Sequence, residues 1–261
     1  MGVILTDLTP ATLTAAIEDN LFELFRAIGR LPGGRLEESE RLISFRTGLP
    51  SLFFNGAART RDISVAEVAA RFSEPFSWWT GPQSSPPGVD SVLEASGLAS
   101  GGRDMPGMAM PLTQIDERRA HPPGVEVVRV HDETGIGLWA RLFSEAHGVP
   151  PSAGQAWLEA AQRLRFRDVP WTHWVGYVDD APAGVGLSYL GAGVVGLYGI
   201  GTLPRARRRG VGSALTVAPM LAARDAGYVA AILQSTAEGE ALYPRLGFRS
   251  YCTISRFLGG V

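Results

Sequence analysis

The chain has 261 residues, which is long enough for one large domain or two small ones. Apolar residues make up 45% and charged residues 19%, a composition that excludes an intrinsically disordered chain. The formal net charge is −2 and all 24 basic residues are arginine. No overall positive field would therefore recruit nucleic acid or an acidic membrane, and the absence of lysine excludes a Walker P-loop.

Metal, membrane and disulfide chemistry find little support in the sequence. A single cysteine, Cys252, excludes an intramolecular disulfide and a cysteine-based zinc cluster. The histidines at positions 121, 131, 147 and 173 lack metal-ligand spacing. The first residues lack the order of a secretory signal, and no apolar run reaches the length of a membrane span. We therefore expect a cytoplasmic protein with no metal, no membrane contact and no nucleic-acid partner.

The elements expected in the N-terminal part begin with a helix. Apolar residues at helical spacing predict it over Leu13–Ile28. Two short apolar runs within Arg41–Phe54, split by Gly48-Leu49-Pro50, predict a pair of strands. The pattern then predicts a helix, a strand, a Gly/Pro/Ser-rich loop and a second helix, at Val65–Phe72, Phe76–Trp79, 80–88 and Val89–Leu98.

Residues 116–123 combine charge with a proline pair and are predicted as a linker between an N-terminal domain, 1–115, and a C-terminal domain, 124–261. The second domain has strand patterns at Val125–Val130, Trp171–Val178, Ala183–Leu190, Val194–Leu203, Tyr228–Leu233 and Phe248–Phe257. Helix patterns stand at Trp139–His147, Gln155–Phe166, Gly212–Ala226 and Gly239–Leu246. The turn sequence at 179–182 makes the first strands an antiparallel meander, and the whole pattern predicts an α+β fold.

One strand-to-helix junction, 199–213, is suited to bind an anion. Pro204 cannot continue a central strand, while Gly210 and Gly212 let the backbone turn tightly and approach a ligand. The free N–H groups and positive dipole end of the following helix attract phosphate. Four arginines stand just upstream, at positions 205, 207, 208 and 209. A solvated surface run or a nucleic-acid patch would also explain the arginines, and the patch predicts steeply salt-dependent binding.

Two motifs in this half resemble the GNAT superfamily of N-acetyltransferases. Arg207-x-x-Gly210-x-Gly212 is similar to its coenzyme A signature, and Leu242-Tyr243-x-x-Leu246-Gly247-Phe248 to its C-terminal signature. The resemblance covers about residues 124–258. It implies a mixed, mostly antiparallel central sheet flanked by helices (the acyl-CoA N-acyltransferase fold), here with a smaller α+β N-terminal domain.

The resemblance also implies a role for each matching residue. The fourth and fifth strands would part, and the pantetheine of acetyl-CoA, or of another acyl-CoA, would lie in the gap. Tyr243 would be the catalytic acid that protonates the departing thiolate, although a tyrosine that only packs is the alternative. The cofactor-binding residues implied by position are Thr202, Leu203, Arg207, Arg208, Arg209, Gly210, Val211, Gly212, Ser213 and Thr236.

The reaction implied is acyl transfer from acyl-CoA to a primary amine of a small molecule or peptide, by direct attack in a ternary complex. The strand at 194–203 carries no acid, so the general base stays open between Glu145, His147 and a water chain. A catalytically weak acyl-CoA-binding regulatory module is the alternative. The acceptor and the oligomeric state, a homodimer included, are not fixed by the sequence.

Several features depart from the family pattern. Pro219 should kink its helix, and only one strand follows the second signature, so a segment such as Gly107–Leu112 could complete the sheet edge. The glycines of 191–196 match a dinucleotide motif, but no helix follows, which indicates a hairpin turn. The N-terminal domain is either a degenerate acetyltransferase-like domain or an unrelated packing domain.

Overall fold

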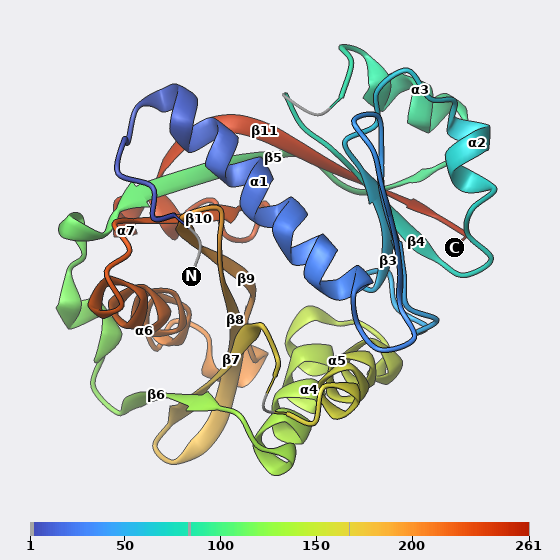
Figure 1. Cartoon of the computed structure of the whole chain (residues 1–261). Coiled ribbons are helices and arrows are strands. Elements are labelled where there is room, and N and C mark those ends of the chain that lie inside the picture. Colours follow the sequence, from blue (N-terminus) through green and yellow to red (C-terminus); the bar gives the residue numbers. More distant parts are fainter. Residues whose placement is uncertain (1–2, 83–84, 167, 261) are drawn as a thin grey trace.

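The computed structural model describes residues 3–82, 85–166 and 168–260, so positions 83–84 of the loop predicted at 80–88 lie outside it. Within these ranges the strands form one 11-stranded sheet in the order β1-β2-β3-β4-β11-β5-β10-β9-β8-β7-β6. Figure 1 shows the sheet as two wings that meet at β5 and β11. The predicted α+β class, with a mostly antiparallel sheet flanked by helices, is confirmed.

The N-terminal wing begins with helix α1 (Pro10–Gly29), which lies between the two wings (Figure 1). The helix is capped by Thr9, whose side chain accepts a hydrogen bond from the Thr12 N–H. The other elements are β1 (Arg35–Glu38), β2 (Ile43–Arg46), β3 (Asn55–Ala58), α2 (Val65–Ala69), β4 (Phe76–Thr80), α3 (Val89–Ala95) and β5 (Ala99–Pro111).

The strands of this wing differ from the prediction in two places. The second strand of the expected pair begins at Asn55 rather than within residues 51–54. The reason is the buried side-chain amide of Asn55. Its oxygen accepts from the Thr47 N–H at 3.0 Å, and its nitrogen donates to the Leu49 carbonyl at 2.9 Å. These hydrogen bonds hold the residues between Thr47 and Asn55 in a turn. Strand β1 was not predicted, because its sequence RLEE is that of a short, charged edge strand.

The C-terminal wing follows its predicted order closely. Its strands are β6 (Val125–Val130), β7 (Trp171–Val178), β8 (Ala181–Gly191), β9 (Val194–Thr202), β10 (Ala230–Gln234) and β11 (Arg249–Gly259). Its helices are α4 (Glu133–His147), α5 (Pro151–Arg163), α6 (Val211–Asp225) and α7 (Tyr243–Leu246). The glycine motif at 191–196 is a hairpin turn, as predicted, with φ of 47° at Ala192 and 72° at Gly193. Helix α6 continues unbroken through Pro219, which is buried.

The two wings repeat one order of elements. Strands β1, β2 and β3 are antiparallel neighbours, as are β7, β8 and β9. In each wing the next helix, α2 or α6, leads to a parallel pairing, β3 with β4 or β9 with β10. A further helix and a long strand follow in both. Apart from β6, the sheet order therefore reads the same from either end.

The final strand of each wing crosses to the other wing. Strand β5 pairs with β10 and β11, and β11 pairs with β5 and β4, all antiparallel. The segment expected at 107–112 thus joins the C-terminal sheet, although inside it and not at its edge. The linker predicted at 116–123 contains a 3-10 turn, Glu117–Ala120, against α6. The domain boundary there stays a prediction.

The helices divide between the two faces of the C-terminal wing. Figure 1 shows α6 on one side and α1, α4 and α5 on the other. An aromatic-rich core joins α1, α4 and α5 to strands of both wings, and a second core packs α6 and α7 on β9 and β10. In the described part of the chain no helix is long and apolar enough to cross a membrane.

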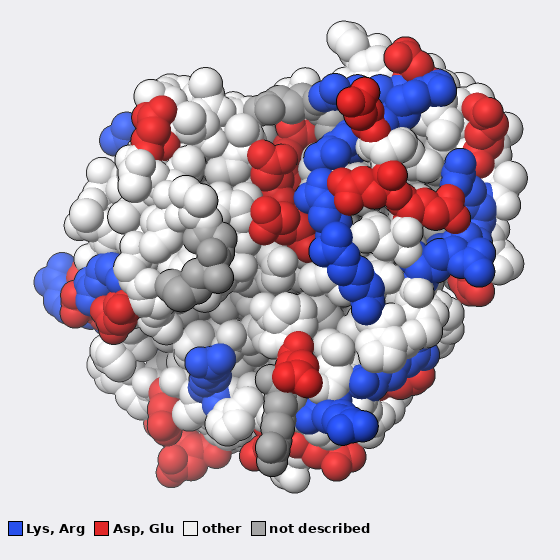
Figure 2. All heavy atoms as spheres, in the orientation of Figure 1, with Lys and Arg blue, Asp and Glu red and all other residues white. Residues whose placement is uncertain are grey.

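Opposite charges alternate on the face over α1 and β1–β3, as Figure 2 shows. Glu38 there pairs with Arg26 at 2.6 Å and with Arg59 at 3.5 Å. Basic and acidic side chains are thus interleaved on this face.

Candidate functional site

A gap opens between β9 and β10. Their parallel ladder runs from Val195–Ala231 to Leu197–Leu233 and ends there. Strand β9 continues to Thr202. Residues 198–202, the open stretch of β9, therefore have no partner strand on the β10 side, and they are only partly buried. An extended ligand could add itself to this free edge like another strand.

A bulge shapes the open stretch. The pairing of β8 with β9 shifts register between Leu187–Tyr198 and Val185–Gly201, and Gly199 within it has φ +54°. The carbonyl of Gly199 accepts a hydrogen bond from His147 Nε2 at 3.1 Å. The bulge was not predicted, although glycines at 196, 199 and 201 within an apolar strand are a signal for one.

Helix α6 begins next to this gap with its N–H groups free. Its N-cap, Gly210, has no side-chain oxygen and makes no capping hydrogen bond. Among the described residues, no hydrogen bond uses the main-chain N–H groups of residues 208–213. The first helical turn thus presents unpaired donors and the positive end of the helix dipole to an anion.

Gly210 and Gly212 are glycines for two different physical reasons. Gly210 has φ +86°, and a Cβ there would lie 2.7 Å from Pro122. Gly210 is therefore required by the loop itself, as its predicted role in a tight turn implies. A Cβ on Gly212 would meet only Leu242 at 3.4 Å and Thr202 at 3.5 Å. Gly212 thus faces both the end of β9 and the start of α7, at the mouth of the gap.

The arginines of the loop divide into paired and unpaired. Arg205 pairs with Glu145, and Arg209 pairs with Asp179 at 2.8 Å. Arg207 and Arg208 are exposed and have no ion pair with any described residue. These two guanidinium groups are free to bind phosphate.

Both main-chain groups of Leu203 already have a protein partner, and its predicted contact with pantetheine stays a prediction that only the second lone pair of its carbonyl could serve. Its N–H donates to the Ala183 carbonyl and its carbonyl accepts from the Ala206 N–H, both at 2.9 Å. The side chain is fully buried. The free main-chain edge of β9 lies instead on the residues before it, up to Thr202.

Tyr243 lies at the start of α7, across the gap from α6. Its ring is buried against Phe248, with centroids 5.8 Å apart, and it belongs to the core that holds Leu197 and Leu233. Burial raises the pKa of Tyr243 to about 12. No described residue forms a hydrogen bond with its hydroxyl. Thr236 follows β10 in an exposed turn, so its side chain is accessible beside the gap.

The two base candidates differ in their surroundings. Glu145 is exposed, and its carboxylate forms an ion pair with Arg205. His147 keeps an exposed edge, yet burial of its ring lowers its pKa below 6.5, and the Gly199 hydrogen bond and the Glu238 charge only partly oppose this effect. Because a carbonyl only accepts, Nε2 carries the proton of the neutral ring and Nδ1 keeps a free lone pair.

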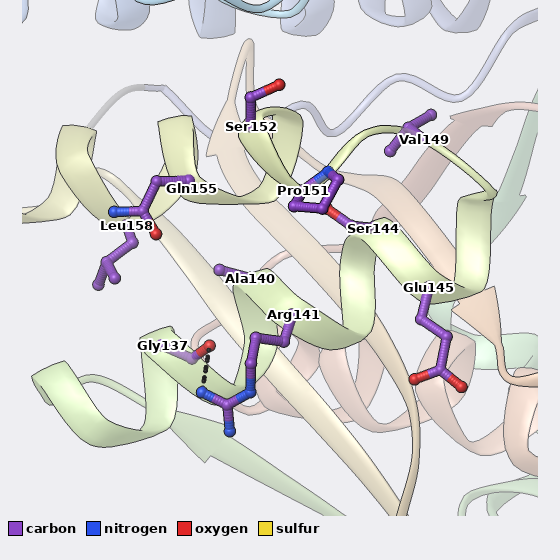
Figure 3. Close-up of a pocket in the computed structure, with 10 residues that line it drawn as sticks. All are labelled: Gly137, Ala140, Arg141, Ser144, Glu145, Val149, Pro151, Ser152, Gln155 and Leu158. Carbon is purple, nitrogen blue, oxygen red and sulfur yellow. Dashed lines mark hydrogen bonds between the residues drawn. The ribbon is translucent and has the colours of Figure 1, made fainter.

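A separate hollow of about 740 Å³ lies between α4 and α5. Figure 3 shows lining residues from both helices, among them Arg141 and Glu145 on α4 and Gln155 and Leu158 on α5, with Arg141 bonded to the Gly137 carbonyl. Its lining comes only from residues 137–158, so it is not part of the gap beside α6. Over the described ranges, no group of three or more potential metal ligands occurs.

Comparison with known proteins identifies part of the chain. The family model described as an Acetyltransferase (GNAT) domain matches residues 170–250. This range contains the gap, the first turn of α6 and Tyr243. No curated protein matches the sequence.

Solved structures resemble the chain along nearly its whole length. A GCN5-related N-acetyltransferase from Kribbella flavida is 18% identical, with a TM-score of 0.67 and coverage of 94% of this chain and 96% of its own. One from Sphaerobacter thermophilus is 18% identical, with a TM-score of 0.57 and coverage of 96% and 93%. A tandem GNAT protein from the clavulanic acid biosynthesis pathway is 15% identical, with a TM-score of 0.55 and coverage of 96% and 93%. At these identities the likeness establishes the fold.

Proposed function

From the GNAT acetyltransferase domain at residues 170–250, we propose that the protein is an N-acyltransferase that moves an acetyl or other acyl group from acyl-CoA to a primary amine. The observation that carries this proposal is the gap between β9 and β10, which opens beside an uncapped helix N-terminus. The two features fit the two parts of one ligand, an extended pantetheine and a pyrophosphate.

The residues present can hold acetyl-CoA, which supplies the acyl thioester. The N–H groups of residues 208–213 would bind the pyrophosphate, and Arg207 and Arg208 would add charge-assisted hydrogen bonds. Gly212 keeps the approach to this turn clear of side-chain atoms. The open stretch of β9 would bind the amide groups of the pantetheine, and Thr236 stands across the gap.

Tyr243 would act on the departing thiolate as a hydrogen-bond donor. A phenol with a pKa of about 12 is fully protonated at neutral pH. The conjugate acid of a thiolate has a pKa of about 8.5. Because the pKa of Tyr243 is much higher, complete proton transfer from the phenol to the thiolate is unfavourable. We infer that Tyr243 stabilises the thiolate mainly by donating a hydrogen bond.

His147 is the better of the two base candidates. Its neutral ring contacts the open stretch of β9 at Gly199, whereas the Glu145 carboxylate is held by Arg205. A neutral imidazole with a free Nδ1 lone pair can take the proton that the amine loses when it attacks. The amine would attack directly in a ternary complex.

We propose further that the N-terminal wing is a degenerate acetyltransferase-like domain. Its order of elements repeats that of the C-terminal wing, and the two wings exchange their final strands. An unrelated packing domain would have no reason to repeat this order.

The second candidate is a regulatory module that binds acyl-CoA and transfers slowly. The observation that favours it is the absence of any acid in β9, together with the high pKa of Tyr243.

Acetyl transfer to a broad amine panel, measured by thiol release, separates the two candidates. The proposal expects at least one amine to be acetylated at a catalytic rate, with release of one free thiol per amide formed. Acetyl-CoA binding without transfer to any amine would favour the regulatory module. Absence of binding by the folded protein would overturn both.

A further inference from the structure

Arg256 is a charged residue in the otherwise apolar end of β11, and its charge has no partner of opposite sign. The side chain is partly buried, and no described carboxylate forms an ion pair with it. Burial lowers its pKa from the usual range of a guanidinium, but a guanidinium stays protonated in proteins. A partly buried cation without a counter-ion is costly unless something compensates it.

Most of the hydrogen-bonding capacity of Arg256 is unused. Its Nε and Nη2 both donate to the Gly101 carbonyl, the former at 2.9 Å. A guanidinium has five N–H donors in a planar fork, so three of them have no partner among the described residues. The guanidinium carbon lies 5.4 Å from the centre of the Trp79 ring and 5.9 Å from that of Phe53. Ring contacts of this kind leave the edge of the fork free for a ligand.

The rings connect Arg256 to the open stretch of β9. Phe53 contacts Phe143 of α4, with centroids 5.6 Å apart, and Phe143 contacts His147 at 4.7 Å. His147 in turn contacts Gly199 in the bulge. Phe53 and Trp79 are partly exposed residues of the N-terminal wing. Arg256 and His147 therefore lie at the two ends of a run of contacting rings from both wings, in which Phe143 is buried and Phe53 is partly exposed, beside the place where an acyl group would be transferred.

We propose that Arg256 binds a carboxylate of the amine acceptor, so that the acceptors are amino acids or related amino-carboxylates. This inference rests on the proposed N-acyltransferase function and specifies its substrate class. The amine would lie toward His147 and Gly199, and the carboxylate would take the free edge of the guanidinium.

A carboxylate fits the site better than other groups. Its two oxygens match the paired donors of a guanidinium, and its single charge balances the single charge of Arg256. The Trp79 and Phe53 rings would cover the apolar part of such an acceptor. The N-terminal wing would thereby supply one wall of the acceptor site.

Ligand binding in the presence of coenzyme A tests the inference independently of turnover. The probes are N-acetyl amino acids with uncharged side chains, each compared with its neutral carboxamide. We expect the wild type to bind the acids at least about tenfold more tightly than the amides, since a hydrogen bond to a charged group contributes at least this much. In Arg256→Gln the ratio should fall to about one, and Arg256→Lys should keep part of it.

Arg224→Gln is the matched control, because it removes a surface arginine that pairs with Glu117, and it should keep the wild-type ratio. A merely structural role of Arg256 would weaken acids and amides alike and leave their ratio unchanged, which would overturn the inference. So would equal binding of acids and amides by the wild type, absence of binding at millimolar concentrations, or a preference for phosphorylated amines. A preserved ratio without acetyl transfer to any amine would instead overturn only the proposed function.

Discussion

Helices α2 and α6 occupy the same place in the two wings, yet their N-termini are chemically opposite. Helix α2 is closed by a capping box, in which the Ser64 side chain accepts from the Glu67 N–H and the Glu67 carboxylate accepts from the Ser64 N–H. Helix α6 begins at a glycine with no cap, and two unpaired arginines precede it. Helix α2 satisfies its own N–H donors and adds a negative charge at its N-terminus. Helix α6 leaves its N–H donors unpaired, so a ligand can supply both the acceptors and the negative charge.

The strands before these helices differ in the same way. Strand β3 ends at Ala58, directly after its last pairing with β4 at Ala57, so it has no open stretch. The N-terminal half, 1–115, also contains neither tyrosine nor histidine. One element order thus supports a ligand site in one wing and a closed structural unit in the other, and the difference lies in a few residues at one helix terminus.

The largest expected effect comes from Tyr243, which has no counterpart in the N-terminal wing because that wing contains no tyrosine. Tyr243→Phe removes the hydroxyl and keeps the buried ring, so the fold and acetyl-CoA binding should persist. We expect kcat to fall by about 100-fold or more, the typical cost of removing one hydrogen-bond donor to the charge that develops in the transition state. Steady-state kinetics would check this, with Tyr228→Phe, just past the C-terminal end of α6, as the control. An unchanged kcat would assign Tyr243 a packing role only.

Removal of the two unpaired arginines should weaken coenzyme binding. We expect Arg207→Ala/Arg208→Ala to raise the Kd of acetyl-CoA by about 10- to 100-fold, the equivalent of about one charge-assisted hydrogen bond. Arg35→Ala/Arg61→Ala in the N-terminal wing is the matched double control. Equal affinities of the two double variants would mean that the arginine loop does not bind the phosphates.

Acid should act on catalysis through His147. Because burial lowers the pKa of His147 below 6.5, the ring is neutral at neutral pH and gains a proton only as the pH falls through this lowered pKa. The acid limb of kcat should therefore lie below pH 6.5, and His147→Gln should lower kcat several-fold and remove that limb. A limb that persists in His147→Gln would show that another group is the base.

The smallest effect is expected at helix α2, whose N-terminus is capped. Ser64→Ala opens the capping box of α2 and should cost about 1 kcal/mol of stability, measurable as a lower midpoint of denaturant unfolding. We expect it to create no second coenzyme site, because β3 has no open stretch beside the helix. A second bound acetyl-CoA per chain in this variant would contradict the comparison of the wings.

Much of the C-terminal wing could be predicted, because its elements are long and its motifs are local. Arg207, Gly210 and Gly212 stand at the helix start as expected, and Tyr243 lies across the gap from them. The pairing state of the arginines and the use of Leu203 could not be predicted, since both depend on residues distant in sequence: Glu145 and Asp179 for the arginines, Ala183 for Leu203.

The N-terminal wing was less predictable. Its strands are short, and the apolar run within residues 51–54 resembles a strand, but the hydrogen bonds of the buried Asn55 side chain fix the chain before it as a turn. The missing last strand of the C-terminal wing indicated that residues 107–112 could join its sheet, but the pairing of β11 with β4 has no signal in the sequence. For the same reason the contact of Arg256 with Trp79 and Phe53 was not predicted, although an arginine in an apolar strand is itself a signal.

Acetyl-CoA calorimetry on two matched variants tests the central claim most directly. Gly212→Asp and Ala66→Asp place the same carboxylate at the second position of α6 and of α2, and the contacts of Gly212 leave room for the new side chain. The account predicts one acetyl-CoA per wild-type chain, binding weakened at least about 100-fold in Gly212→Asp, and no change in Ala66→Asp. Equal binding by the two folded variants would contradict it.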